Sequence, residues 1–240
     1  MRSEDRSVLD LPSRVGDRLE SYGPKADQVV EIFTAGGEAL GQVVLIHGGY
    51  WRPAYDRVHL RSYAAALSDL GWRAVLIEYR RNPGSPDDYL EDVRAAIMHC
   101  GGGVIIGHSA GGHLALLAAN ESTSPLIKSV IALAPIGDLA EAEKLNLDDG
   151  AVKEFLGTSA LNRPDLDPNL ALNTNVPVLI IHGSDDIRVP IELSKTLHNS
   201  YINAGLDSEF VEVENIGHFE LIDYRARQID IVVAHLKKLV

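Results

Sequence analysis

The sequence is poor in several features that would point to particular kinds of protein. It has a single cysteine, Cys100, among 240 residues, which excludes an internal disulfide and a zinc site built from cysteines. Basic residues are outnumbered, with 22 Lys and Arg against 34 Asp and Glu, for a net charge of −12. This balance argues against nucleic acid or an anionic membrane surface as a partner, because both require a cationic face. No apolar run approaches the roughly 18 residues of a membrane-spanning helix.

The composition is otherwise that of an ordinary folded domain. Hydrophobic residues make up 45% and charged residues 23%, close to the average of soluble proteins, so a disordered chain is excluded. The first twenty residues are charged throughout and lack the apolar core of a signal peptide. We therefore expect a cytoplasmic protein in which these residues form a solvated or docking arm. Without a repeat or a linker-like tract, residues 1–240 are predicted to form a single domain.

Short apolar runs alternate with amphipathic stretches from about residue 40 onward. A nearly continuous apolar run of strand length that stops at Gly, His or Pro is typical of a strand buried on both faces of a parallel sheet. Such strands are predicted at 43–48, 74–79, 104–109, 130–135 and 176–183, with weaker ones at 31–36 and 209–217. Helices are predicted at 57–70, 86–99, 110–120, 190–204 and 220–238. The alternation predicts an α/β fold, with a mostly parallel central sheet and helices on both faces.

The expected strand at 31–36 would be antiparallel and would form the leading edge of the sheet. Residues 138–175 are the longest stretch without a strong strand, and they contain short helical patterns followed by Pro164 and Pro168. We expect this segment to be a small cap inserted over one end of the sheet.

The sequence Gly107-His108-Ser109-Ala110-Gly111 follows a predicted strand directly and precedes an apolar helix. A G-x-S-x-G pentapeptide in this context indicates a nucleophile elbow, a tight turn that presents the serine hydroxyl at the carboxyl edge of the sheet. Its glycines leave room for the neighbouring strand and helix. Ser109 is therefore the predicted nucleophile, and the alternative is a small-residue turn with an idle serine.

A nucleophilic serine needs a base, and the base needs an acid that orients it. The strand at 176–183 runs into Asp185 and Asp186, and the segment at 209–217 runs into His218, which gives the expected order Ser, Asp, His. His218 is the predicted base. Neighbouring side chains in an extended turn point in different directions, so only one of Asp185 and Asp186 is expected to orient His218; the choice of Asp186 rests on the resemblance described below.

His47-Gly48-Gly49-Tyr50-Trp51 follows the strand at 43–48. Adjacent glycines allow backbone N–H groups to approach a tetrahedral oxyanion. The amides of this loop and the N–H of Ala110, the residue after the serine, are the predicted oxyanion donors. Trp51 has two interpretations: it forms an aromatic wall against the substrate, or it packs in the interior and supports the loop.

The remaining histidines and acids have structural interpretations. His47 and His182 end strands and are expected to tie loops together, while His108 and His113 are expected to be packed or hydrogen-bonded. Glu78 and Asp92 are expected to be structural acids. The histidines form neither an HExxH motif nor another i, i+4 ligand pair, and no dinucleotide or phosphate-loop motif is present, so we predict no metal and no cofactor.

These motifs together resemble the α/β-hydrolase superfamily over about residues 43 to 220. The HGGYW form at 47–51, with GHSAGGHLAL (107–116), HGSDDIRVP (182–190) and Gly-His at 217–218, is similar to the kynurenine formamidase (arylformamidase) group and related carboxylesterases. The resemblance implies that Ser109 is the nucleophile, Asp186 the acid and His218 the base, with oxyanion donors at Gly49, Tyr50 and Ala110. Related esterases have YRLAP where this chain has Tyr79-Arg80-Arg81-Asn82-Pro83, so the nearby pocket is expected to differ.

We therefore expect a serine hydrolase that cleaves a small acyl ester or an aryl formamide such as N-formylkynurenine. A general short-chain carboxylesterase is the alternative, and a non-catalytic ligand-binding protein on the same fold is a minor one. The expected partner is a small-molecule ester or amide. The oligomeric state is left open, with a homodimer as one option.

Overall fold

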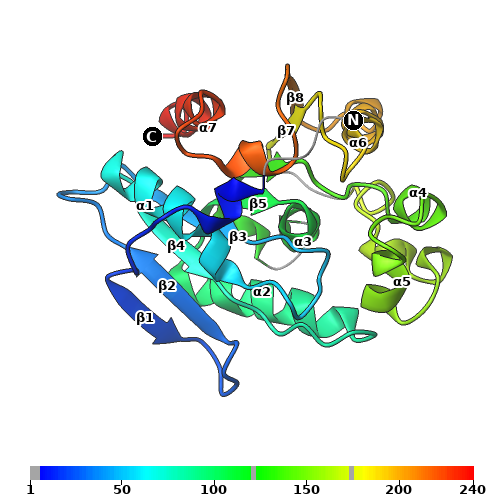
Figure 1. The fold of residues 1–240 in the computed structure, drawn as a ribbon, viewed down its shortest axis with the longest axis horizontal. Coiled ribbons are helices and arrows are strands. Elements are labelled where there is room, and N and C mark those ends of the chain that lie inside the picture. Colours follow the sequence, from blue (N-terminus) through cyan, green and yellow to red (C-terminus); the bar gives the residue numbers. More distant parts are fainter. Residues whose placement is uncertain (1–5, 120–122, 173–175) are drawn as a thin grey trace.

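The structure is a computed structural model and describes residues 6–119, 123–172 and 176–240. Within these ranges the strands form one eight-stranded sheet with the order β1-β2-β4-β3-β5-β6-β7-β8 (Figure 1). β1 and β2 pair antiparallel, as do β2 and β4, and all later pairings are parallel. The strands are β1 (Arg18–Ser21), β2 (Val29–Phe33), β3 (Gln42–Ile46), β4 (Arg73–Ile77), β5 (Gly103–His108), β6 (Ile127–Leu133), β7 (Val178–Gly183) and β8 (Ser208–Val213).

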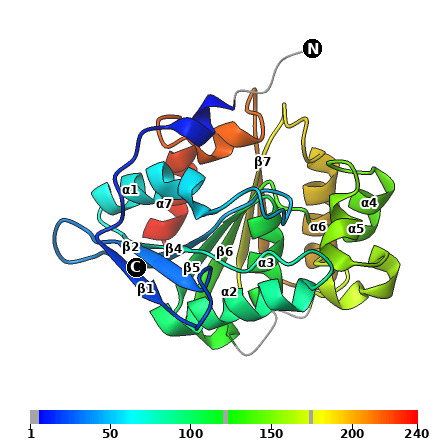
Figure 2. The same cartoon turned by 60° about the horizontal axis from the view of Figure 1, so that its bottom comes forward.

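Helices cover both faces of the sheet, as the alternating pattern predicts (Figure 2). α1 and α7 pack with the core on one face, and α2, α3 and α6 pack with the core on the other. The α-helices are α1 (Arg61–Asp69), α2 (Pro86–Cys100), α3 (Ala110–Ala119), α4 (Leu139–Lys144), α5 (Ala151–Leu156), α6 (Ile191–Asn203) and α7 (Gln228–Lys237). Single 3-10 turns are η1 (Ser7–Asp10), η2 (Arg57–Leu60), η3 (Ser124–Leu126), η4 (Ala160–Asn162), η5 (Pro164–Leu166) and η6 (Phe219–Ile222).

The continuous apolar runs are explained by burial on both sides of the sheet. In β3, Val43 and Leu45 belong to the core beneath α1 and α7, whereas Val44 and Ile46 belong to the opposite core. Side chains along a strand alternate between faces, so a strand covered by helices on both sides has no polar positions. The α/β-hydrolase fold predicted from the sequence is confirmed.

The N-terminal region differs from the prediction. The strand expected at 31–36 is present as β2 and is antiparallel, but β1 lies outside it and forms the edge of the sheet. Of the two expectations for the N-terminal arm, the residues described from position 6 onward fit the docked one, because η1 packs against η2 and η6 and Val8 is buried. Their polar sequence has too few apolar positions to reveal this packing.

The segment between β6 and β7 contains α4, α5, η4 and η5. Two acids hold the start of α4: Asp138 accepts from the Glu141 N–H at 2.8 Å, and Asp167 accepts from the Leu139 N–H at 2.9 Å. Residues 173–175, at the end of the predicted cap, lie outside the described residues, as does residue 120 at the end of the predicted 110–120 helix. In the described parts of the chain, no helix combines the length and apolarity needed to cross a bilayer.

Helix α3 begins two residues after β5 ends, and the passage is tight. A Cβ at Gly107 would stand 2.3 Å from the carbonyl oxygen of Gly111, and a Cβ at Gly111 would stand 2.2 Å from that of Ile46. Both neighbours are backbone atoms, which cannot rotate away. The two outer glycines of the G-x-S-x-G sequence therefore permit the contact of α3 with β5 and β3.

We expect Gly111→Ala to lower the free energy of unfolding by about 1–3 kcal/mol or more, because the added methyl group must displace backbone. Urea unfolding measures the change. Gly36→Ala is the matched control, because nothing lies within 4 Å of a Cβ placed there. Equal stability of the two variants would contradict the tight passage.

Candidate active site

Ser109 lies in the turn between β5 and α3 with a backbone φ of +57°. This left-handed conformation is uncommon for a residue other than glycine, and such strain is typically retained at functional positions. Its N–H donates to the carbonyl oxygen of Leu133 in β6 at 2.8 Å, and its own carbonyl accepts from the His113 N–H at 3.1 Å. The turn is thus fixed from both sides by backbone hydrogen bonds.

His218 and Asp186 form a hydrogen-bonded pair at the carboxyl ends of β7 and β8. The distance from His218 Nδ1 to Asp186 Oδ2 is 2.7 Å. Because the carboxylate can only accept, Nδ1 carries the proton of this bond. The other carboxylate oxygen, Oδ1, accepts from the backbone N–H groups of Arg188 at 2.8 Å and Val189 at 2.9 Å.

A second histidine contacts the same carboxylate. His182 Nε2 lies 3.2 Å from Asp186 Oδ2 and 2.9 Å from the carbonyl oxygen of Val189, so it carries a proton, while Nδ1 lies 2.7 Å from Ser194 Oγ. Burial alone would raise the pKa of Asp186, but the charge of His218 and the hydrogen bonds from both histidines outweigh it and hold that pKa well below its usual range. His182 ties β7 to this loop, in agreement with its expected structural role.

Asp185, the alternative acid, lies apart from this pair. Its Oδ1 accepts from Ser184 Oγ at 3.2 Å, whereas the Asp186 side chain is fully buried between two histidines. The preference for Asp186 as the partner of His218 therefore agrees with the geometry.

His108 supports His218 from the elbow. Its Nε2 lies 3.1 Å from the His218 carbonyl oxygen, and the two rings are 4.6 Å apart between centroids. Burial lowers the pKa of His108 well below its ordinary value, and the neighbouring His218 contributes a smaller effect in the same direction. The ring is therefore neutral, and its Nε2–H donates to that carbonyl. His113 is also buried and bonds the Leu166 carbonyl at 2.8 Å, as its structural interpretation implies.

The loop after β3 approaches the elbow closely. Gly49, Tyr50 and Trp51 have successive φ values of +109°, +50° and +57°, and consecutive left-handed residues turn their N–H groups toward a common side. A Cβ at Gly48 would stand 2.9 Å from the Ser109 Cβ, so the backbone passes directly beside the serine. Ala110 is the first residue of α3, where N–H groups have no acceptor within the helix.

The structure buries Trp51 and places it outside the residues that line the pocket beside Ser109. Its ring stacks on Phe155 of α5 at 4.5 Å and meets His113 edge-on at 5.1 Å. The interpretation of Trp51 as an aromatic wall against the substrate is thus wrong for this geometry, and the interior alternative fits. An aromatic side chain on a left-handed residue packs behind the loop, which the sequence alone could not show.

A buried ion pair supports the same loop from below. His47 Nε2 lies 2.9 Å from Glu78 Oε1, and the Glu78 carboxylate also pairs with Arg81 and accepts from the Arg57 N–H. Burial alone would raise the pKa of Glu78, but His47, Arg81 and Arg57 outweigh it and lower the pKa to about 2 from an ordinary 4.5. Glu78 is thus a structural acid, as expected.

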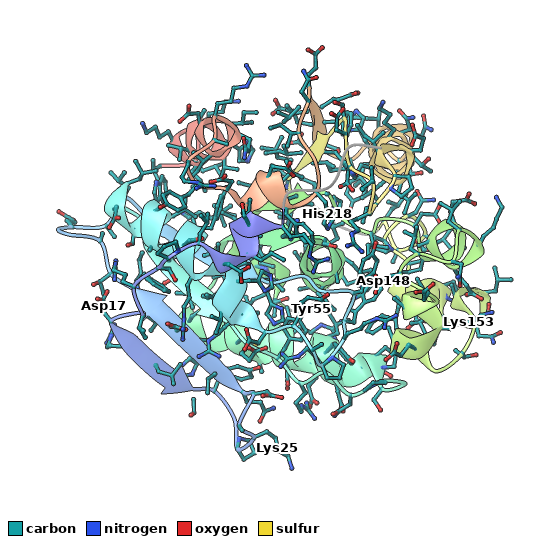
Figure 3. All side chains as sticks on the ribbon, in the orientation of Figure 1. Asp17, Lys25, Tyr55, Asp148, Lys153 and His218 are labelled. Carbon is teal, nitrogen blue, oxygen red and sulfur yellow. The ribbon has the colours of Figure 1, made fainter. Side chains whose placement is uncertain are left out.

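The pocket beside Ser109 and His218 is narrow, with a cavity volume of about 30 Å³. Figure 3 labels three of its residues, Tyr55, Asp148 and His218, which come from three separate segments. The complete lining is Arg6, Leu9, Gly49, Tyr50, Tyr55, His59, His108, Ser109, Asp148, Arg188, His218 and Phe219. Several of these residues were missed by sequence reasoning, namely Arg6, Leu9, Tyr55, His59, Asp148, Arg188 and Phe219. Two of them could have been found from the sequence. Arg188 lies two residues after Asp186, and Phe219 directly follows His218, so their neighbours in the chain pointed to the site.

The lowered pKa of Glu78 predicts that the protein loses stability in acid. Because its folded pKa lies below its unfolded value, its contribution is fully present above pH 4.5 and is lost as the pH falls toward 2. The difference corresponds to roughly 3 kcal/mol. We expect the stability gap between wild type and Glu78→Gln, measured by urea unfolding, to narrow by that order between pH 7 and pH 2.5.

The exposed Glu38 provides the control, and Glu38→Gln should follow the wild-type pH dependence. A gap that stays constant across this range would show that Glu78 is not held ionised by its partners.

Comparison with known proteins agrees with this geometry. A family model described as the alpha/beta hydrolase family matches residues 43–175, more than half of the chain. Kynurenine formamidase from Danio rerio is 24% identical, and the alignment covers 92% of this chain and 78% of that protein. LipM of Mycobacterium tuberculosis, named as a probable carboxylic ester hydrolase, is 26% identical over 62% of this chain and 42% of its own length.

Among solved structures, esterase B from Lactobacillus rhamnosis shares the fold with a TM-score of 0.80 at 17% identity. The match covers 97% of this chain and 89% of that chain. The elbow after β5, the order of the strands and the family match lead to one conclusion: the chain belongs to the alpha/beta hydrolase family.

Proposed function

We propose that the chain is a serine hydrolase in which Ser109 is the nucleophile, His218 the general base and Asp186 the acid that orients it. The observation that carries this proposal is the 2.7 Å bond from His218 Nδ1 to the buried Asp186, in a pocket that His218 shares with the strained Ser109. A base fixed in this tautomer, beside a serine presented on a left-handed turn, suits acyl transfer.

The reaction follows from these positions. Ser109 Oγ attacks the carbonyl carbon and passes its proton to His218 Nε2, while the N–H groups of Gly49, Tyr50 and Ala110 bind the oxyanion. The bond to the leaving group then breaks, and Nε2 returns the proton to the leaving nitrogen or oxygen. A water molecule activated by His218 cleaves the acyl-enzyme and regenerates Ser109.

We propose an aryl formamide of the N-formylkynurenine type as the substrate. The relative named kynurenine formamidase aligns with 92% of the chain, and its name supports this choice. An aryl amine is a better leaving group than an alkyl amine, so a triad suited to esters can cleave its formamide. The products would be formate and the free aryl amine.

A short-chain carboxylesterase is the second candidate. The relative named as a carboxylic ester hydrolase favours it, and the chemistry at Ser109 would be the same for an ester. The third candidate, a ligand-binding protein without catalytic activity, is disfavoured because every group that a triad requires is present in the sequence.

We expect Ser109→Ala to lower kcat/KM by several orders of magnitude with little change in stability, because only the attacking hydroxyl is removed. Hydrolysis of p-nitrophenyl acetate measures the loss. Ser200→Ala on α6 is the matched control and should retain activity. A fluorophosphonate probe should label wild type and not Ser109→Ala, and turnover that persists in that variant would exclude Ser109.

We expect Asp186→Asn to lower kcat by about 10³- to 10⁴-fold, because an amide cannot hold the imidazole in the required tautomer. Asp185→Asn is its neighbour control and should stay near wild type. Circular dichroism verifies that both variants fold. A severe loss in Asp185→Asn with a mild one in Asp186→Asn would transfer the role of the acid.

A substrate panel separates the two candidate functions. We expect kcat/KM on N-formylkynurenine to exceed that on p-nitrophenyl acetate, and ester hydrolysis to fall steeply from acetate to longer acyl chains. If N-formylkynurenine is untouched while butyrate or longer esters are good substrates, the carboxylesterase is the better assignment.

A further inference from the structure

The pocket beside Ser109 carries more positive than negative charge, in contrast to the molecule as a whole. Among its described lining residues, Arg6 and Arg188 are cations and Asp148 is the carboxylate, although the chain has a net charge of −12. His59 and His108 add no charge to this balance, because desolvation lowers the pKa of His59 to about 4 and that of His108 well below its usual range. A cationic pocket in an acidic protein favours an anionic group on its ligand.

Asp148 is already committed to protein cations. Its Oδ2 lies 3.0 Å from Arg52 Nε, and its Oδ1 lies 3.5 Å from Arg188 Nη1. It reaches this position on a strained turn, in which Asp148 and Asp149 have φ values of +46° and +54°. Strain of this kind persists where the surrounding contacts hold it. Asp148 therefore orients the Arg188 side chain and does not supply a free negative charge to the pocket.

Arg188 is fixed relative to the triad. Its backbone N–H donates to Asp186 Oδ1 at 2.8 Å, and its carbonyl accepts from the Tyr50 hydroxyl at 2.7 Å, so its Cα is held between the acid and the loop that passes Ser109. About 31% of its side chain stays exposed, and Arg188 is one of the residues that line the pocket. Arg6 reaches the same pocket from the N-terminal segment, with its guanidinium 5.1 Å above the Phe219 ring.

We propose that Arg188, assisted by Arg6, binds a carboxylate of the substrate, and that Asp148 is a positioning residue for Arg188. This rests on the proposed hydrolase function and narrows the substrate to aryl formamides whose ring carries a side chain ending in a carboxylate. A guanidinium pairs with a carboxylate through two parallel hydrogen bonds, which fixes the orientation of the ligand as well as its position. The scissile carbonyl is thereby directed to Ser109 by a group at the far end of the molecule.

Two substrates that differ by one carboxymethyl group test this assignment. 2-Formamidoacetophenone is neutral, and 3-(2-formamidobenzoyl)propanoate adds the acid to the same ring and ketone. In wild type we expect the carboxylate to have a kcat/KM about 10- to 100-fold higher, the range of a hydrogen bond to a charged group. The measured quantity is the ratio of the two kcat/KM values.

Four variants locate the cause of the preference. Arg188→Gln should remove about 10- to 100-fold from the ratio, mainly through KM for the acid, and Arg188→Lys should restore part of it. Arg6 is exposed, so Arg6→Gln should lower the ratio by a smaller factor. Arg18→Gln, on the edge strand β1, is the charge-matched control and should leave the ratio at its wild-type value.

For Asp148, the readout is the same ratio together with its salt dependence. Asp148→Asn should lower the preference for the acid and make it more sensitive to salt, because Arg188 then loses its orienting partner. A general loss of kcat on both substrates, with the ratio kept, would assign Asp148 a purely structural role.

A wild-type ratio near one, or a ratio unchanged in both Arg188→Gln and Arg6→Gln, overturns the carboxylate site. If neither formamide is hydrolysed, the proposed formamidase function fails instead. The corresponding acetate esters, 2-acetoxyacetophenone and 3-(2-acetoxybenzoyl)propanoate, then give the same ratio and decide the carboxylate site independently.

Discussion

The close passage of α3 beside β5 and β3 is the constraint on which the site depends. Glycines at 107 and 111 face backbone carbonyls at less than 2.5 Å from where a Cβ would be, and Gly48 faces the backbone and Cβ of the elbow in the same way. Because protein interiors tolerate little overlap, strand, helix and loop can approach only along this path. Ser109 lies on this path with its left-handed φ, and backbone hydrogen bonds to the Leu133 carbonyl and from the His113 N–H hold it there.

Buried charges then connect the strand ends to the loops above them. Glu78 lies with His47 beneath the loop of Gly49 and Tyr50, and Asp186 lies between His182 and His218. A buried carboxylate is costly unless its oxygens are hydrogen-bonded. Glu78 pairs with Arg81 and accepts from the Arg57 N–H, and Asp186 accepts from two histidines and two backbone N–H groups. Each pair fixes a loop whose sequence alone would leave it free to adopt other conformations, so loop geometry is specified by electrostatics at the edge of the sheet.

Sequence reasoning succeeded where the signal was local. The β-strands predicted from apolar runs and the tight turn at Ser109 depend on residues adjacent in the chain, and the structure places them accordingly. The structure also places Asp186 against His218, while its role as the acid stays a prediction. Sequence reasoning failed for β1, whose exposed residues carry no apolar pattern, and for Trp51, because side-chain direction in a left-handed loop is set by its neighbours. Most of the residues that line the pocket were also missed. Arg6 and Asp148, for example, lie far from Ser109 in the sequence and are brought beside it only by the tertiary fold.

The pocket consequently separates into two parts with different origins. Ser109, Asp186 and His218 follow three parallel strands, whose positions are fixed by the ladder of β5 to β8. The charged side is assembled by ion pairs that join three loops through Asp148, Arg52 and Arg188. Such exposed pairs are individually weak and are screened by salt, whereas a strand ladder is not. The three residues of the proposed triad are therefore held by the cooperative core. The charged side of the pocket, which we propose binds the substrate, is held by ion pairs that sequence change in the loops can alter without disturbing the fold.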